Sequence, residues 1–176
     1  IRKAIYHSEV TQIIDKFINE RIGEKENINE EYLDIFSKND IKRFNDYGRF
    51  YRSIAFYYNT DLDLCTVRNY NSRPKQMIDA VLQSFQKKEQ SFKKQDIEKL
   101  LKNTIELMKI LKEDPNREYL IDACIPFSLS SWDILISNIG KIIQDEEMKN
   151  TFEKSKATTS NVNKRVEIIN KMLKGC

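Results

Sequence analysis

Four lysines lie close together between two stretches with helical patterning, in the segment QKKEQSFKKQ from Gln86 to Gln95, whose only apolar residue is Phe92. Ammonium groups at this density can bind lipid headgroups or nucleic-acid phosphates, and a basic residue near an anionic membrane contributes about 1 kcal/mol. The alternative is that lysines at helix ends serve solubility and pair with Glu89 or Asp96. We treat the four as the candidate anionic-ligand site and call them the lysine cluster: Lys87, Lys88, Lys93 and Lys94.

A second group of basic residues lies near the start of the most aromatic stretch of the chain, at Lys42, Arg43, Arg49 and Arg52. These side chains could also contact headgroups or phosphates. The alternative is a solvated face on which they pair with Asp46. The sequence alone leaves both interpretations open.

Motifs for catalysis are absent from the sequence. No two glycines lie close enough to form a phosphate-binding loop. Three serines lack the nucleophile elbow and a nearby base: Ser128, Ser130 and Ser131. The acidic pairs Glu146-Glu147 and Asp61/Asp63 are spaced for a solvated helix surface or a loop. We expect a protein that is not an enzyme and that takes no cofactor and no small-molecule substrate.

The cysteines and the single histidine indicate neither a metal site nor a disulfide framework. Cys65, Cys124 and Cys176 are widely spaced and odd in number, and His7 is the only histidine. Cys65 and Cys124 fall within helical patterns, which is typical of small buried hydrophobic residues. We expect no metal ion, no Cys–His catalytic pair and a cytoplasmic location.

The composition predicts one soluble, charge-rich domain over residues 1–176. Hydrophobic residues make up 40% and charged residues 32%, and the net charge of +3 is small. Four glycines and three prolines are too few for the turns of a β-rich protein. No signal peptide and no apolar run of membrane-spanning length is present. Because the first residue is Ile1, we expect the chain to be part of a longer protein.

The stretch from Asp46 to Arg68 predicts the helix around which the domain is built. Its aromatic density favours neighbours on two sides, and Asp46 is a suitable N-cap. Apolar and aromatic residues recur along it at the three-then-four spacing of one helix face. They are Tyr47, Phe50, Tyr51, Ile54, Ala55, Tyr58, Leu62 and Cys65.

The remaining pattern predicts further helices and no strands. We expect an all-α fold of six or seven helices, packed as antiparallel hairpins into a bundle or short superhelical stack. Gly23 stops the first helix, Pro74 and Asp96 mark the starts of two others, and Pro126 kinks a fourth. The expected ranges are Ser8–Ile22, Ser72–Phe85, Asp96–Leu111, Glu118–Ser130, Trp132–Ile143 and Asn161–Lys174. Trp132 lies on an apolar face, which favours a core anchor over a stacking platform for a ligand.

The order of several motifs resembles one family of adaptors. Leu33-Asp34-Ile35-Phe36 is similar to a short element before the family's aromatic helix, and Asp46 to Leu62 is similar to that helix. Later segments follow the family's order: Glu98 to Leu111, Ile121-Asp122-Ala123, Asp133 to Ile143 and Val162 to Leu173. The chain thus resembles the later part of the ANTH domain, found in endocytic clathrin-assembly adaptors that bind inositol phospholipids.

This resemblance implies an adaptor of membrane trafficking that is peripheral to membranes or clathrin-coated vesicles. Its partners would be an inositol phospholipid surface and clathrin or SNARE-type proteins. The family's headgroup site, a lysine-rich motif with a histidine, would precede Ile1, and His7 lacks the preceding lysines. Asn45 stands where the family often has tryptophan, and Asp61 where it has arginine. We expect an N-terminally incomplete ANTH-like domain, onto which none of the family's lipid-binding residues is carried.

A second hypothesis comes from a different class of protein. The chain would be a helical scaffold or a nucleic-acid-binding module that uses the lysine cluster, whose binding would weaken steeply with added salt.

Overall fold

The computed structural model describes residues 5–24 and 27–175 of the chain. Over these residues the fold is all-α, as predicted, with ten α-helices, one 3-10 helix and two antiparallel pairs of two-residue strands. The helices outnumber the six or seven expected because short elements fill segments that the sequence patterning left as connections. Ile1 and Cys176, which entered the sequence predictions, lie outside the described residues.

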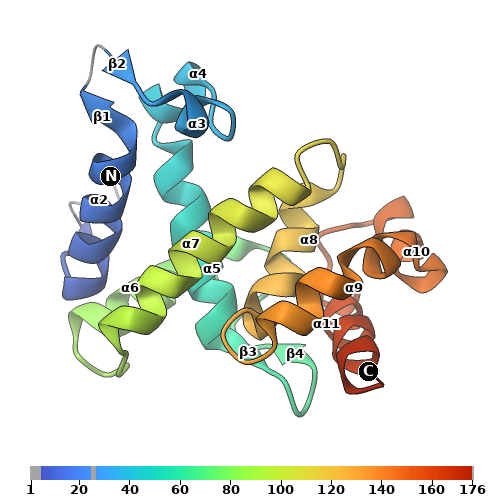
Figure 1. The fold of residues 1–176 in the computed structure, drawn as a ribbon. Coiled ribbons are helices and arrows are strands. Elements are labelled where there is room, and N and C mark those ends of the chain that lie inside the picture. The colour runs from blue at the N-terminus through green and yellow to red at the C-terminus, as the bar shows by residue number, and fades with distance from the viewer. Residues whose placement is uncertain (1–4, 25–26, 176) are drawn as a thin grey trace.

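Helix α5 (Asn45–Asn59) is the spine of the fold (Figure 1). It contacts helices on several sides, as its aromatic density predicts, and Phe50, Ile54 and Phe56 are fully buried. The helices that contact it are α2 (Glu9–Ile22), α4 (Lys38–Lys42), α6 (Pro74–Gln86), α7 (Lys94–Ile110), α8 (Arg117–Cys124) and the 3-10 helix η1 (Ile125–Phe127). The predicted central helix is therefore confirmed, although both of its ends differ from the prediction.

The start of α5 is not capped by Asp46. The N-cap is Phe44, in the left-handed region with φ 58° and ψ 30° and without a side-chain cap bond. Asp46 lies within the first turn and is fully buried; its carboxylate accepts from the Tyr32 hydroxyl at 3.0 Å and from the Tyr47 amide at 2.9 Å. Burial raises the pKa of the Asp46 carboxyl above its ordinary value.

The end of α5 is at Asn59 and not at Arg68. The chain turns there through β3 (Thr60–Asp61) and β4 (Thr66–Val67), which pair antiparallel. The Asp61 carboxylate accepts from the amides of Asp63 and Leu64 at 3.1 and 3.0 Å, and this Asx-type turn stops the helix. Leu62 and Cys65 pack against the core from the hairpin, so their helical spacing misled the prediction.

The other sequence signals vary in how well they place the boundaries. Ser8 and Gly23 bound α2 as expected. After Cys124 the chain tightens into η1 around Pro126, where a kinked helix was predicted. The helices expected at Trp132–Ile143 and Asn161–Lys174 are confirmed as α9 (Trp132–Gln144) and α11 (Thr159–Lys174). The expected ranges did not include the short elements β1 (Gly23–Glu24), β2 (Asn27–Ile28), α3 (Glu30–Leu33) and α10 (Glu146–Glu153).

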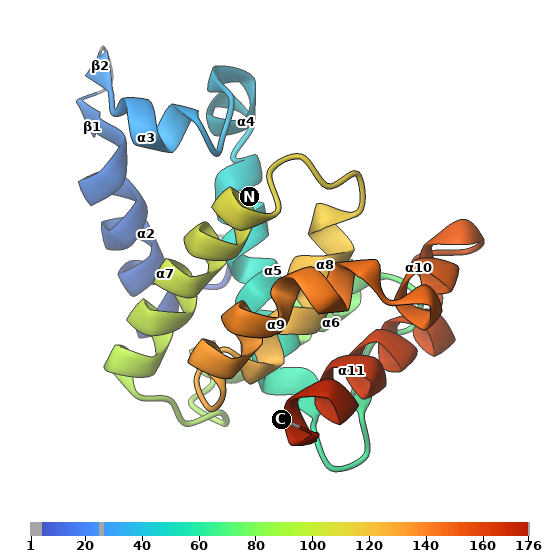
Figure 2. The same ribbon diagram turned by 45° about the vertical axis from the view of Figure 1, so that its right-hand side comes forward.

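Two segments rich in basic residues lie at opposite ends of the molecule. The connection between α6 and α7 lies at one end, and α4 lies at the other, in both views (Figures 1 and 2). The connection between β3 and β4 lies at the same end as that between α6 and α7.

Candidate functional site

The lysine cluster occupies the connection between α6 and α7, and all four of its side chains are exposed. Lys87 is the C-cap of α6 and Lys88 follows it with φ 59°. Lys93 is the N-cap of α7 and Lys94 is its first residue. The structure therefore gathers the four predicted site residues at one end of the molecule.

Lys93 and Lys94 lie at the N-terminus of α7, where the helix backbone disfavours positive charge. The last carbonyls of α6 stabilise cations such as Lys87, whereas the first amides of α7 repel them. Helix α7 begins two residues before the predicted cap, Asp96, and its N-cap Lys93 makes no side-chain cap hydrogen bond. The partial positive charge of this helix end therefore adds to that of Lys93 and Lys94.

Of the four lysines, only Lys94 forms an ion pair with a described acidic residue. Lys94 Nζ lies 3.9 Å from Glu98 Oε1, which is a weak, exposed pair. Within the described part of the chain, no carboxylate lies within 4.0 Å of the ammonium groups of Lys87, Lys88 or Lys93. The pairing with Glu89 or Asp96 that would have explained the cluster is absent from these residues, and its positive potential remains available to an external anion.

Phe92, the aromatic residue within the cluster, points toward the protein. It is half-buried and meets Phe85 edge to face, with ring centroids 5.6 Å apart. Phe85 in turn meets Tyr58 at 5.1 Å. This stack anchors the connection between α6 and α7, so Phe92 is not a platform on which a base could stack.

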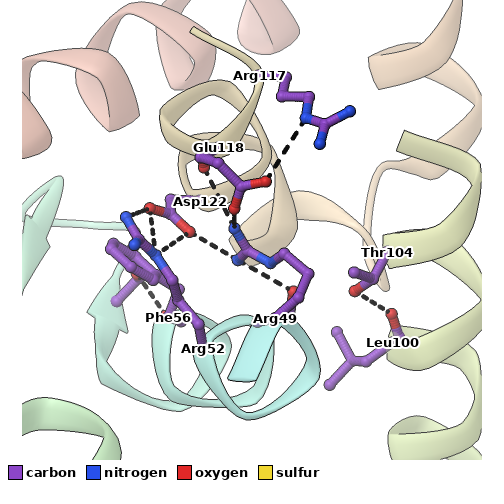
Figure 3. Close-up of polar contacts among 10 residues, drawn as sticks. Arg49, Arg52, Phe56, Leu100, Thr104, Arg117, Glu118 and Asp122 are labelled. Carbon is purple, nitrogen blue, oxygen red and sulfur yellow. Dashed lines mark hydrogen bonds and ion pairs between the residues drawn. The ribbon is translucent and has the colours of Figure 1, made fainter. Parts of the chain in front are cut away.

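The second predicted basic cluster is split by the fold. Lys42 and Arg43 are exposed, whereas Arg49 is 4% exposed and Arg52 is largely covered. The side chains of Arg49 and Arg52 point across to α8 (Figure 3). Neither interpretation left open by the sequence, contact with an anionic ligand or a solvated face paired with Asp46, therefore applies to all four residues.

Arg49 and Arg52 converge on Asp122. Arg49 Nη2 donates to Asp122 Oδ1 at 2.7 Å, and its Nη1 donates to Glu118 Oε2 at 2.8 Å. Arg52 Nε donates to both Asp122 oxygens at 2.9 Å, and Arg52 Nη2 also donates to Oδ2 (Figure 3). Burial acts to lower the pKa of Arg52, but the charge of Asp122 and the hydrogen bonds to it outweigh burial and raise that pKa. These contacts tie α5 to α8 and leave the two guanidinium groups neutralised.

A pocket of about 370 Å³ lies beside this network, between α4, α5 and α8. Three arginines line it, but three carboxylates balance them: Asp40 and Glu118 in the lining, and Asp122 just behind. The pocket consequently has no excess charge with which to select an anion.

Arg165 is a buried cation that the sequence patterning missed, because it interrupts the apolar face of α11. It is 1% exposed and donates to Thr151 Oγ1 at 2.8 Å, to the Thr151 carbonyl at 2.8 Å and to the Lys156 carbonyl at 2.7 Å. Its guanidinium carbon lies 4.4 Å from the centre of the Phe152 ring. Burial lowers the pKa of Arg165 to about 10. This residue fastens α10 to α11.

The groups considered for catalysis or metal binding are dispersed. Cys124 is fully buried, and burial raises the pKa of its thiol to about 12. His7 is exposed beside Gln12, and the buried Ser128 hydroxyl donates to the Ile125 carbonyl. Over residues 5–24 and 27–175, no three His, Cys, Asp or Glu side chains are arranged to hold a metal ion.

The same described residues include no helix both long and apolar enough to cross a membrane. Comparison of the chain with protein-family models, with curated proteins and with solved structures finds no match in any of the three.

Proposed function

We propose that this chain is a binding module of membrane trafficking, an adaptor without catalytic activity that docks on inositol phospholipid headgroups through the lysine cluster. One observation carries the proposal: Lys93 and Lys94 stand at the uncapped N-terminus of α7, beside Lys87 and Lys88, with a single weak ion pair among the four. An anion at this place gains from the lysines and from the helix end together.

Two features favour a lipid surface over nucleic acid as the anionic partner. Proteins that bind single strands add exposed aromatic rings to their basic grooves, but Phe92 is stacked inward on Phe85. Leu64 is 71% exposed on the connection between β3 and β4, at the same end of the molecule. An exposed leucine at the same end of the molecule as a group of basic residues suits a membrane interface.

The protein partners of the adaptor are SNARE helices or clathrin machinery, as the ANTH resemblance implies. Helix α9 supports a helical partner, because half-buried apolar side chains recur along it at four-three-four spacing. They are Trp132, Ile136, Ile139 and Ile143.

The test is co-sedimentation of the chain with vesicles. We expect it to pellet with vesicles that contain phosphatidylinositol bisphosphate, to stay in solution with phosphatidylcholine alone, and to dissociate as salt is raised. A short single-stranded RNA and a duplex DNA serve as competitors. Failure to pellet with the vesicles that contain phosphatidylinositol bisphosphate would overturn the proposal. Release from the vesicles by either nucleic acid at equal phosphate concentration would favour the nucleic-acid hypothesis instead.

A further inference from the structure

Phe44 is placed where the fold gains little from a phenyl ring. It is 68% exposed, and its ring meets Tyr47 at a centroid distance of 5.9 Å. Its backbone is in the left-handed region, with φ 58° and ψ 30°. A bulky residue is strained in this conformation, whereas glycine or asparagine adopts it more readily.

The corner that carries Phe44 is held by several hydrogen bonds. The Phe44 amide donates to the Ile41 carbonyl at 3.1 Å, and the Phe44 carbonyl accepts from the Gly48 amide at 3.1 Å. Asp40 accepts from the Ser37 amide at 3.1 Å and from the Asn45 side chain at 3.0 Å. None of these bonds involves the phenyl ring, so the corner would form equally well with asparagine in its place.

The surroundings of Phe44 are positively charged. Three exposed basic side chains come from the same short segment: Lys38, Lys42 and Arg43. No carboxylate of the described residues lies within 4.0 Å of their charged nitrogens. Asp40 is the one acidic residue of α4, and its oxygens are engaged by Ser37 and Asn45. We call this group of four residues, Lys38, Lys42, Arg43 and Phe44, the α4 tip.

We propose that the α4 tip is a second membrane contact, at which the Phe44 ring enters the interface of an anionic lipid surface while the three basic side chains bind headgroups. Aromatic rings favour the headgroup level of a bilayer, and nearby cations are attracted to anionic lipids. The tip lies at the end of the molecule opposite the lysine cluster (Figures 1 and 2). One flat membrane therefore cannot reach both, and the proposal stands or falls separately from docking through the lysine cluster.

Tryptophan fluorescence at the tip tests the insertion of the ring. The protein carries Phe44→Trp together with Trp132→Phe, so that the fluorescence comes from position 44 alone. Glutamine also replaces Lys87, Lys88, Lys93 and Lys94, so that the vesicles cannot bind through the lysine cluster. With phosphatidylserine vesicles we expect its emission to shift to the blue and to be quenched by brominated acyl chains. The control carries Ile134→Trp instead of Phe44→Trp, on an exposed position of α9 beside Asp133, and should show neither effect. Unchanged emission at position 44 would overturn the proposal.

Phe44→Asn separates a membrane role from a structural one. In the background with the four lysines replaced, we expect it to weaken binding to phosphatidylserine vesicles about tenfold or more. Its thermal stability should equal or exceed that of the parent, because asparagine relieves the strained backbone. Unchanged vesicle affinity would show that the ring does not contact the membrane and would overturn the proposal. Loss of thermal stability would show that the ring serves the fold and would overturn it as well.

Discussion

Arg52 holds both carboxylate oxygens of Asp122, each 2.9 Å from its Nε, across a sequence separation of 70 residues. Arg49 donates to the same carboxylate from one turn earlier in α5. A single acidic side chain on α8 thus pairs with two cations of the central helix, and Glu118 of the same helix adds a second carboxylate to Arg49. The packing of α5 against α8 depends on Asp122.

Replacement of Asp122 by asparagine should therefore be severely destabilising. It leaves two buried guanidinium groups without a full counter-charge, and breaking a buried pair in this way costs about 3–5 kcal/mol. Glu118→Gln is the matched control, because Glu118 also pairs with Arg49 but is partly exposed, and its loss should cost less than about 1 kcal/mol. Urea unfolding measures both values. Equal costs for the two variants would contradict this account of the network.

Gly48 offers a stabilising substitution. It lies inside α5, and a Cβ added to it would meet nothing within 4 Å. Gly48→Ala should raise the free energy of unfolding by about 0.5–1 kcal/mol, because alanine loses less backbone entropy in a helix. Gly23→Ala is the control with the opposite sign, since Gly23 has φ 76°, where a side chain is strained. Thermal unfolding of both variants checks the prediction, and a lower melting temperature for Gly48→Ala would refute it.

Asp46 should make stability fall as the pH rises. Burial raises the pKa of its carboxyl, so the folded state binds its proton more tightly than the unfolded state. The free energy of unfolding then decreases as the pH climbs from about 4 through the raised folded pKa. Asp46→Asn should match the parent near pH 4 and exceed it at pH 7, by urea unfolding at each pH.

Asp40 provides the comparison for that experiment. Hydrogen bonds from the side chains of Asn45 and Ser37 lower its pKa, so its contribution is present at neutral pH and is lost as the pH falls through the lowered value. Asp40→Asn should therefore be less stable than the parent at pH 7, with a difference that shrinks on acidification. Identical pH dependence of the two variants would contradict the assignment of opposite shifts.

The helices that the sequence predicted well are those whose apolar spacing is uninterrupted and whose ends carry strong signals. Helix α2 is one example, between Ser8 and Gly23. The end of α5 was misplaced because Leu62 and Cys65 continue the helical spacing although the Asp61 turn has already stopped the helix. Local periodicity cannot distinguish a hairpin that packs on the core from one more turn of helix.

The candidate site was predictable where it depends on local charge and not where it depends on distant partners. The exposure of the lysine cluster follows from its polar surroundings. The burial of Arg49 and Arg52 does not, because their partner Asp122 lies far along the chain. Likewise, the sequence places Phe44 directly before the aromatic stretch that begins at Asp46, and only the left-handed turn at the start of α5 leaves its side chain exposed.

The central claim, docking of the lysine cluster on inositol phospholipids, is tested most directly by two variants of equal charge. In one, glutamine replaces the lysine cluster; in the other, it replaces four exposed lysines elsewhere, Lys75, Lys109, Lys141 and Lys154. Affinity for vesicles with phosphatidylinositol bisphosphate should fall on the order of thousandfold in the first, at about 1 kcal/mol per lysine, and only severalfold in the second. Equal affinities for the two variants would contradict the claim.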